Sequence, residues 1–451
     1  MTKDLTAGSP MRLILSFGLP TLLGMLFQQF YNLMDTMIVG KLLGAQALAA
    51  VGSTSSISFL VIGFCMGVCN GFAIPVAQRM GAKEYSQMRR FVVNAAYLSA
   101  LFALVLTVVT GLFCRNILVV MRTPADIIDN AYAYIFVIFM GIPATFLYNL
   151  LAAVIRSLGD SKTPVYFLAI SSVLNIGLDL AFILVFHLGV AGAALATVIS
   201  QGISGLACLV YMIKKFPILH MSPEERRLDG RSCRTLCFMG VPMGLQYSIT
   251  AIGSIFLQSA VNGLGSLYVA AVAAGAKLFQ LLGCPYDALG ATMATYCGQN
   301  VGAVKLDRLG KGIRACSLLG LIYALAAFGA MLLFAPQSTM LFLDPTEPQL
   351  DTLVALTAQY VRILTAFFFP LALVNIVRFS IQGMGYSMFA ILAGVLEMLA
   401  RTAVGSIFVP LFGYTAACFA SPAAWLCADL FLLPACIHCI RRLRQLFPAT
   451  A

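Results

Sequence analysis

The feature that most constrains this chain is a series of long apolar runs, separated by short segments that carry most of its charges. A helix needs about 20 mostly apolar residues to cross a bilayer. The chain has 451 residues, of which 61% are hydrophobic and 10% charged, whereas a soluble domain carries about 25% charged residues. We therefore expect an all-α polytopic membrane protein with twelve transmembrane helices, at 12–36, 46–75, 91–114, 127–151, 164–187, 190–213, 236–261, 267–297, 313–335, 352–378, 387–410 and 413–440.

Short motifs of the first half return in the second half, in the same order and 221 to 226 residues later. Gly18-Leu-Pro20 returns as Gly240-Val-Pro242, and Ile155-Arg-Ser-Leu-Gly159 returns as Ile381-Gln-Gly-Met-Gly385. Parallel repeats of this kind are typical of transporters that bind substrate between two lobes. The sequence therefore predicts two six-helix lobes, with an N-lobe at 1–213, a cytoplasmic linker loop at 214–234 and a C-lobe at 235–451.

The net charge of +11 lies mostly in short loops, which disfavours a nucleic-acid partner. Nearly all loop cations, among which we place Arg378, fall on the side of the two termini, and only Lys41, Arg115 and Arg122 fall on the other. Cytoplasmic loops carry the excess of Lys and Arg, so both termini should be cytoplasmic. We expect no removable signal peptide before the first run. The 13 cysteines predict no disulfide framework, and the lone Cys436–Cys439 pair is a weak metal signal.

Polar side chains inside apolar runs are the functional candidates, because a charge at the bilayer centre costs at least about 2.5 kcal/mol. Asp35 lies in the first run without a nearby cation. Asn175 and Asp179 are four residues apart in the fifth run, which places them on one helix face, and Thr197 lies in the small-residue run that follows. Together they offer oxygen ligands for a hard cation or a carboxylate that carries a proton; the alternative is a hydrogen-bonded packing role.

The second half carries different charges. Glu397 and Arg401 are four residues apart, acid before base, which predicts a mainly structural ion pair. Lys277 and Asp287 are ten residues apart in the eighth run, and each is open to a partner on another helix. Pro20 interrupts the first run and either acts as a hinge or makes a static kink.

The motifs Gly18-Leu-Pro20, Tyr31-Asn-x-x-Asp35, Ile155-Arg-Ser-Leu-Gly-Asp160-Ser-Lys-Thr-Pro164 and Asn175-Ile-Gly-Leu-Asp179 together resemble the MATE (multidrug and toxic compound extrusion) transporters, of the flippase superfamily that also moves lipid-linked sugars. The resemblance covers about residues 10–445. It implies a two-lobed antiporter that exports organic compounds, with cationic amphiphiles as the expected class, in exchange for H⁺ or Na⁺.

The DinF-type pattern implies a cation-coupling site at Asp35, Asn175, Asp179 and Thr197, a hinge at Pro20, and candidate site-lining residues at Tyr31, Tyr134 and Gln28. The NorM-type acid of the seventh span has no counterpart between Gln246 and Thr250. We expect no cofactor besides the coupling ion, no enzymatic activity, a monomer and a bacterial plasma membrane location.

Two alternatives remain open at this stage. A lipid-linked oligosaccharide flippase of the same superfamily would share the lobes and the repeat, but few basic residues fall inside the spans to bind a pyrophosphate. An integral membrane enzyme would need clusters of acids or histidines in its loops, and His187, His220 and His438 are scattered.

Overall fold

The computed structural model describes residues 3–121, 123–343 and 349–447, and within these residues every element is helical. Arg122, used above to predict the orientation, lies outside the described residues. The first half contains α1 (Pro10–Leu43), α2 (Ala45–Gly81), α3 (Tyr85–Val120), α4 (Ile128–Met140), α5 (Ile142–Ser157), α6 (Thr163–Leu180), the π-helix η1 (Ala181–Val185) and α7 (Gly189–Lys215). The linker holds a short 3₁₀ turn, η2 (Pro217–Leu219).

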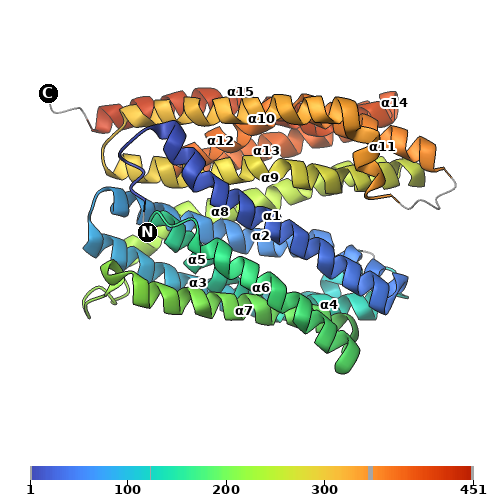
Figure 1. Ribbon diagram of the computed structural model, residues 1–451, viewed down its shortest axis with the longest axis horizontal. Helices are drawn as coiled ribbons and strands as arrows, with labels where there is room; N and C mark the ends of the chain where they lie inside the picture. Colours follow the sequence, from blue (N-terminus) through green and yellow to red (C-terminus); the bar gives the residue numbers. More distant parts are fainter. Residues whose placement is uncertain (1–2, 122, 344–348, 448–451) are drawn as a thin grey trace. The chain divides into compact units, whose positions relative to one another are not determined.

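The second half repeats this order of elements, with one additional short helix before its last helix (Figure 1). It contains α8 (Gly230–Asn262), α9 (Ser266–Gly302), α10 (Asp307–Met340), α11 (Leu350–Ala366), α12 (Phe368–Gly383), α13 (Ser387–Ala403), the π-helix η3 (Val404–Phe408), α14 (Val409–Phe412) and α15 (Tyr414–Leu446).

The predicted number of spans is confirmed. Among the described residues, ten helices are long and apolar enough to cross a membrane, and two bent helix pairs raise the number to twelve. The bent pairs are α4 with α5, at 47°, and α11 with α12, at 51°. Pro143 lies in the first turn of α5 and Pro370 in the first turn of α12, where proline needs no hydrogen-bond donor. The fourth span of each half is therefore broken.

Several helices are longer than a bilayer requires, as the sequence predicts. α2 and α9 each have 37 residues, which at a rise of about 1.5 Å per residue is about 55 Å. The hydrocarbon core is only about 30 Å thick, so these helices must tilt or extend beyond it.

The chain forms two compact units, and their boundaries fall inside helices. Unit 1 contains residues Met1–Asp4 and Leu23–Ser248, and unit 2 contains Leu5–Leu22 and Ile249–Ala451. The first part of α1 therefore belongs to unit 2, and the first part of α8 belongs to unit 1. The predicted lobes at 1–213 and 235–451 divide the repeat in sequence, whereas these units divide the chain by packing.

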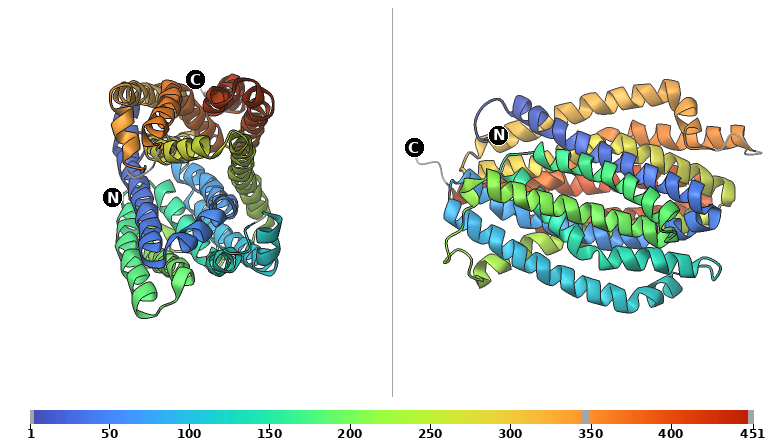
Figure 2. Two further views of the ribbon diagram at one scale, coloured as in Figure 1. Left: turned by 90° about the vertical axis from the view of Figure 1, so that its right-hand side faces the viewer. Right: turned by 60° about the horizontal axis from the view of Figure 1, so that its bottom comes forward.

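Helix contacts inside the two units correspond, which is the structural expression of the repeat. In unit 1, α5 packs on α2 and α7, and α6 packs on α7. In unit 2, α12 packs on α9 and α15, and α13 packs on α15. α6 and α7 lie side by side along most of their length (Figures 1 and 2).

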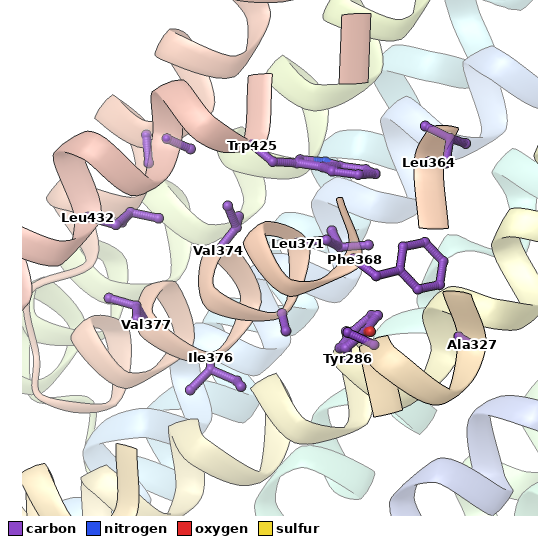
Figure 3. Packing of buried hydrophobic residues seen from close by; sticks show 14 of the residues in the cluster. Tyr286, Ala327, Leu364, Phe368, Leu371, Val374, Ile376, Val377, Trp425 and Leu432 are labelled. Atoms are coloured by element: carbon purple, nitrogen blue, oxygen red, sulfur yellow. The ribbon is translucent and has the colours of Figure 1, made fainter. Parts of the chain in front are cut away.

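Each unit has its own apolar core. In unit 2, the single tryptophan, Trp425, is buried and stacks on Phe279 with ring centroids 5.8 Å apart. In the same core, Phe368 packs edge to face on Tyr286, with ring centroids 5.4 Å apart (Figure 3). Burial of such aromatic side chains contributes a large part of core stability.

The segments that precede α1 and α8 are fixed by specific bonds. In unit 2, the backbone N–H of Leu5 donates to Gln299 Oε1 at 3.1 Å, and Lys305 Nζ donates to the Thr6 carbonyl at 2.8 Å. In unit 1, Arg89 makes two 2.7 Å bonds to the Glu225 carboxylate in the linker. The linker is therefore held against the start of α3.

Candidate functional site

The predicted site residues of the first half, with the exception of Pro20, lie in unit 1, on four helices. The structure brings together the polar groups of Asp35 on α1, Asn175 and Asp179 on α6, and Thr197 on α7. The side chains of Asp35, Asn175 and Asp179 are buried, with relative exposures of 8%, 1% and 0%. Tyr31, one helical turn before Asp35, faces the same cluster.

The Thr197 hydroxyl organises the cluster through three hydrogen bonds. It donates to the Ala193 carbonyl at 3.1 Å and accepts from the Tyr31 hydroxyl at 3.0 Å. It also accepts from Asn175 Nδ2 at 3.4 Å. Since a hydroxyl has one donor and two acceptor sites, all of its capacity is used. The Asn175 amide must therefore point its nitrogen at Thr197 and its oxygen elsewhere.

The remaining polar atoms of the cluster are acceptors without donors. Among the described residues, Asp35 Oδ1, Asn175 Oδ1 and both Asp179 carboxylate oxygens are buried and have no hydrogen-bond partner. The Asp35 and Asp179 carboxyl groups also lie close enough to repel each other when both are ionised and to share a hydrogen bond when one of them is protonated. A buried acceptor left unpaired costs about 1–3 kcal/mol, so this arrangement favours a bound proton or an oxygen-liganded cation.

The other three predicted residues lie at different distances from this cluster. Tyr134 on α4 is half-buried and interacts electrostatically with Tyr31, Asp35 and Asp179. Gln28 is half-buried on α1, two turns before Asp35. Pro20 lies inside α1, which stays helical through it, and the chain passes from unit 2 to unit 1 two residues later.

The start of α6 is set by the turn at the end of the repeat motif, Gly159-Asp160. Gly159 has φ +93°, and a Cβ there would lie 2.2 Å from the Lys3 carbonyl oxygen, so only glycine fits. Asp160 then accepts hydrogen bonds from the backbone N–H of Lys162 and Thr163, each at 3.1 Å. This cap fixes where α6 begins and hence which face presents Asn175 and Asp179. The π-helix η1 begins two residues after Asp179, and such distortions are frequent at functional sites.

The second half holds a different buried cluster, in unit 2. Glu397 on α13 forms ion pairs with Arg401, at 3.2 Å, and with Arg378 on α12. All three side chains are buried. The predicted Glu397–Arg401 pair is therefore confirmed, but the placement of Arg378 among the loop cations is wrong. α12 extends to Gly383 and is packed in the core, so the arginine that ends the predicted span is an interior residue.

Sequence reasoning missed Asp429 on α15. This carboxyl group is buried, lies within electrostatic range of Arg378, and has an Oδ1 atom without a partner among the described residues. The same rule that selected Asp35, an acid inside an apolar run, would have found it. Lys277 and Asp287 are both exposed on α9 and form no ion pair within the described part of the chain.

The described residues offer no further candidate site of the kind that binds a transition metal. In the described residues, no group of three or more His, Cys, Asp or Glu side chains is placed to hold a metal ion. All 13 cysteines are free, including Cys436 and Cys439, which are buried in unit 2. An alkali cation in the unit 1 cluster would instead use carboxylate, amide and hydroxyl oxygens.

The fold and the two clusters define a class: a multi-pass helical membrane protein built from a repeated unit of six spans. The family comparison is specific. The MatE family profile matches residues 20–181 and again residues 242–407, so the chain belongs to the MatE family of membrane transporters. One match falls in each half of the chain, which agrees with the repeat seen in the sequence and in the order of the helices.

Known relatives agree with this assignment. The probable multidrug resistance protein YpnP of Bacillus subtilis (strain 168) is 33% identical over 306 residues, which cover 66% of this chain and 67% of that protein. The probable multidrug resistance protein YoeA of the same organism is 32% identical over 354 residues, covering 77% and 76%. A crystal structure of a MATE protein in complex with MaL6 has a TM-score of 0.91 at 22% identity, covering 99% of this chain and 100% of that one. This last likeness concerns the fold.

Proposed function

We propose that this chain is a secondary active multidrug exporter that moves organic compounds outward in exchange for H⁺ or Na⁺, with coupling at the unit 1 cluster. The observation that carries the proposal is the set of buried oxygen acceptors around Asp35 and Asp179 that find no donor within the described part of the chain. Relatives described as probable multidrug resistance proteins support the cargo class. Buried carboxylates favour cationic amphiphiles as substrates.

Cation binding would act through α1. Asp35 and Tyr31 lie on this helix, whereas Asn175, Asp179 and Thr197 lie on α6 and α7. A proton or Na⁺ held between these groups stabilises one position of α1 against α6 and α7. Because Leu5–Leu22 belong to unit 2, a change in α1 near Pro20 reaches that unit. A ligand shifts a conformational equilibrium only by its differential affinity for the two states, and the donor-free acceptors supply that difference.

The second half supports coupling in unit 1 alone. α8, the counterpart of α1, contains no acidic residue, and the only acid of α13 is Glu397. Glu397 already holds two guanidinium groups, so a further cation there would add unpaired positive charge. Asp429 is the other buried acid among the described residues of the second half, and Arg378 lies within electrostatic range of it.

The excess of loop cations on one side supports an orientation with both termini in the cytoplasm. Bacterial relatives support the plasma membrane of a bacterium as its location. The protein would act as a monomer, with small organic molecules and the lipid bilayer as its partners and no cofactor beyond the coupling ion.

The test is dye efflux from proteoliposomes under an imposed pH or Na⁺ gradient, comparing the wild type with Asp35→Asn. The matched control is Asp129→Asn, which removes an exposed acid of the same unit whose ion pair with Arg115 spans 3.5 Å. Transport that follows one gradient, persists in D129N and disappears in D35N supports the proposal and identifies the ion. Full gradient-driven transport by D35N refutes coupling at this cluster. If the wild type moves no dye under either gradient, the exporter assignment fails in favour of a lipid-linked sugar flippase.

A further inference from the structure

An open groove lies between α13 and α15 in unit 2, two helices that pack side by side. Its volume is about 390 Å³, within the range of small-molecule sites, about 300–1,000 Å³. The lining is formed by Phe389 of α13 and by Leu430, Phe431, Pro434, Ala435 and His438 of α15. All of these side chains are apolar except His438, which is the last of them along α15.

The helix faces beside the groove have the composition of a surface that faces lipid. α13 exposes Leu392 and Leu399, and α15 exposes Leu430 and Ile437. Large aliphatic side chains are what a hydrocarbon environment favours, and both helices belong to apolar spans long enough to cross a membrane. The groove therefore opens towards the bilayer, and a lipid acyl chain suits its apolar lining.

The groove begins at the end of these helices that is nearest the membrane surface. α13 starts at Ser387, so Phe389 lies in its first turn. On α15, which ends at Leu446, the lining extends back from His438 to Leu430, about 12 Å along the axis. An acyl chain that enters beside Phe389 and His438 would therefore run towards the middle of the membrane.

The surface becomes basic beyond His438. Arg441 and Arg442 are exposed and lie three and four residues further along α15, which places them on the same helix face as the histidine. The Arg442 guanidinium lies over the Tyr386 ring, 5.9 Å from its centroid. The ring of Phe389 lies 6.3 Å from that of Tyr386 and 6.5 Å from that of His438. These contacts connect the apolar lining to the cations at the mouth of the groove.

The two arginines at the mouth have no acidic partner. Neither Arg441 nor Arg442 forms an ion pair among the described residues. Each of the two helices is fully described and contains a single acid, Glu397 in α13 and Asp429 in α15, and both acids are buried. Asp429 precedes Arg442 by 13 residues, about 20 Å along the axis. The mouth therefore carries positive charge that suits an anionic headgroup.

We infer that this groove binds one anionic phospholipid, with its phosphodiester group at Arg441 and Arg442 and one acyl chain in the groove. Guanidinium groups donate paired hydrogen bonds to phosphate oxygens, and the His438 imidazole can add another donor. A zwitterionic phospholipid binds less well, because the cation of its headgroup is repelled by the arginines. In the proposed orientation the mouth lies at the cytoplasmic leaflet, where basic pockets between membrane helices are typical sites for anionic headgroups.

The test compares the apparent Tm of the purified protein in detergent micelles that contain either phosphatidylglycerol or phosphatidylcholine. The single tryptophan, Trp425, is buried in α15, so its fluorescence reports the unfolding of unit 2. Phosphatidylglycerol should give a Tm about 5 °C above that in phosphatidylcholine, at about a hundredfold excess over its Kd. Inorganic phosphate should not reproduce this rise, because it leaves the groove empty.

Two double variants locate the effect. Arg441→Gln with Arg442→Gln should abolish the difference between the two lipids. Lys311→Gln with Arg314→Gln, the matched control, removes two exposed cations near the start of α10 in the same unit and should keep it. Because the two lipids are compared within each variant, a direct loss of stability cancels. Equal Tm values for the wild type in both lipids, an equal rise with inorganic phosphate, or equal losses in both variants overturn the inference.

A labelling experiment keeps the inference testable if the double arginine variant fails to fold. A phosphatidylglycerol with a diazirine in its acyl chain should label the wild-type peptides that carry Phe389 and Leu430. It should label the exposed face of α10 at Leu318, Ile322 and Leu325 less strongly, and unlabelled phosphatidylglycerol should reduce the labelling of the groove. Equal labelling of the groove and of α10, with no effect of the competitor, would mean that bulk lipid covers the groove and would overturn the inference. Both measurements are independent of transport, so neither outcome depends on the proposed function.

Discussion

Replacing Glu397 by Gln removes the carboxylate that two buried guanidinium groups share. Arg378 and Arg401 are each less than 10% exposed, so neither can regain water without opening unit 2. Removing one partner of a buried ion pair costs about 3–5 kcal/mol, because a charge is left uncompensated. Arg401 has no other ion pair among the described residues, whereas Arg378 keeps Asp429 within electrostatic range. We therefore expect a loss near the lower end, about 3 kcal/mol.

The single tryptophan makes this loss measurable. Trp425 is buried in unit 2, so its fluorescence on heating in detergent reports the unfolding of that unit. A unit of this size loses about 2–4 °C per kcal/mol, which predicts an apparent Tm about 6–12 °C lower for E397Q. The control is Asp307→Asn, which breaks the exposed pair with Arg444 in the same unit and should cost at most about 1 kcal/mol. Equal shifts in both variants would refute the view that this buried network stabilises unit 2.

Three further predictions concern unit 1. Arg89→Ala should release the linker from α3, so that trypsin cleaves after Arg226 and Arg227 about tenfold faster. Arg79→Ala should not, because it breaks an exposed pair with Glu84 and a 6.0 Å contact over the Phe91 ring, neither of which involves the linker. Arg89 lowers the pKa of Glu225 to about 2. The contact between Arg89 and Glu225 should therefore keep its strength as the pH falls from neutral to about 4.5, and weaken only as the pH falls further towards 2. Hydrogen exchange of the linker backbone that already rises as the pH falls from 7 to 5 would contradict this. Asp179→Asn should abolish gradient-driven transport. It should also raise the temperature at which the protein aggregates at pH 8 without Na⁺, because an amide replaces one of two adjacent buried carboxylates. An aggregation temperature below that of the control Asp129→Asn would show that the two carboxylates do not destabilise the protein.

Hydropathy predicts the spans because each one is long and nearly uncharged, and the structure adds detail that hydropathy does not contain. The breaks between α4 and α5 and between α11 and α12 lie inside apolar runs. Matched prolines mark both breaks, at Pro143 and Pro370, but proline alone does not distinguish a static kink from a 50° bend. Arg378 was misplaced for a related reason: a charge at the end of an apolar run looks the same whether the helix stops there or continues into the core.

The residues of the candidate cluster could be selected from the sequence, whereas the hydrogen bonds among them could not. Asp35, Asn175, Asp179 and Thr197 stand out because oxygen-bearing side chains are costly in lipid. The sequence contains no sign that the Thr197 hydroxyl is fully used by Tyr31, Asn175 and Ala193. That arrangement depends on how three helices pack, and it leaves the buried acceptors of the cluster without donors.

The two halves share a fold and use buried charge in opposite ways. In unit 2, Glu397 meets both guanidinium groups directly, so the ion pairs stabilise the unit without any ligand. In unit 1, the Asp35 and Asp179 carboxyl groups have no counter-charge among the described residues. A site that must bind and release an ion in each cycle cannot carry its own cation, because a permanent partner would compete with the ion at every step. The uncompensated half is therefore the one suited to the proposed coupling, and the compensated half is suited to holding α12 and α13 together.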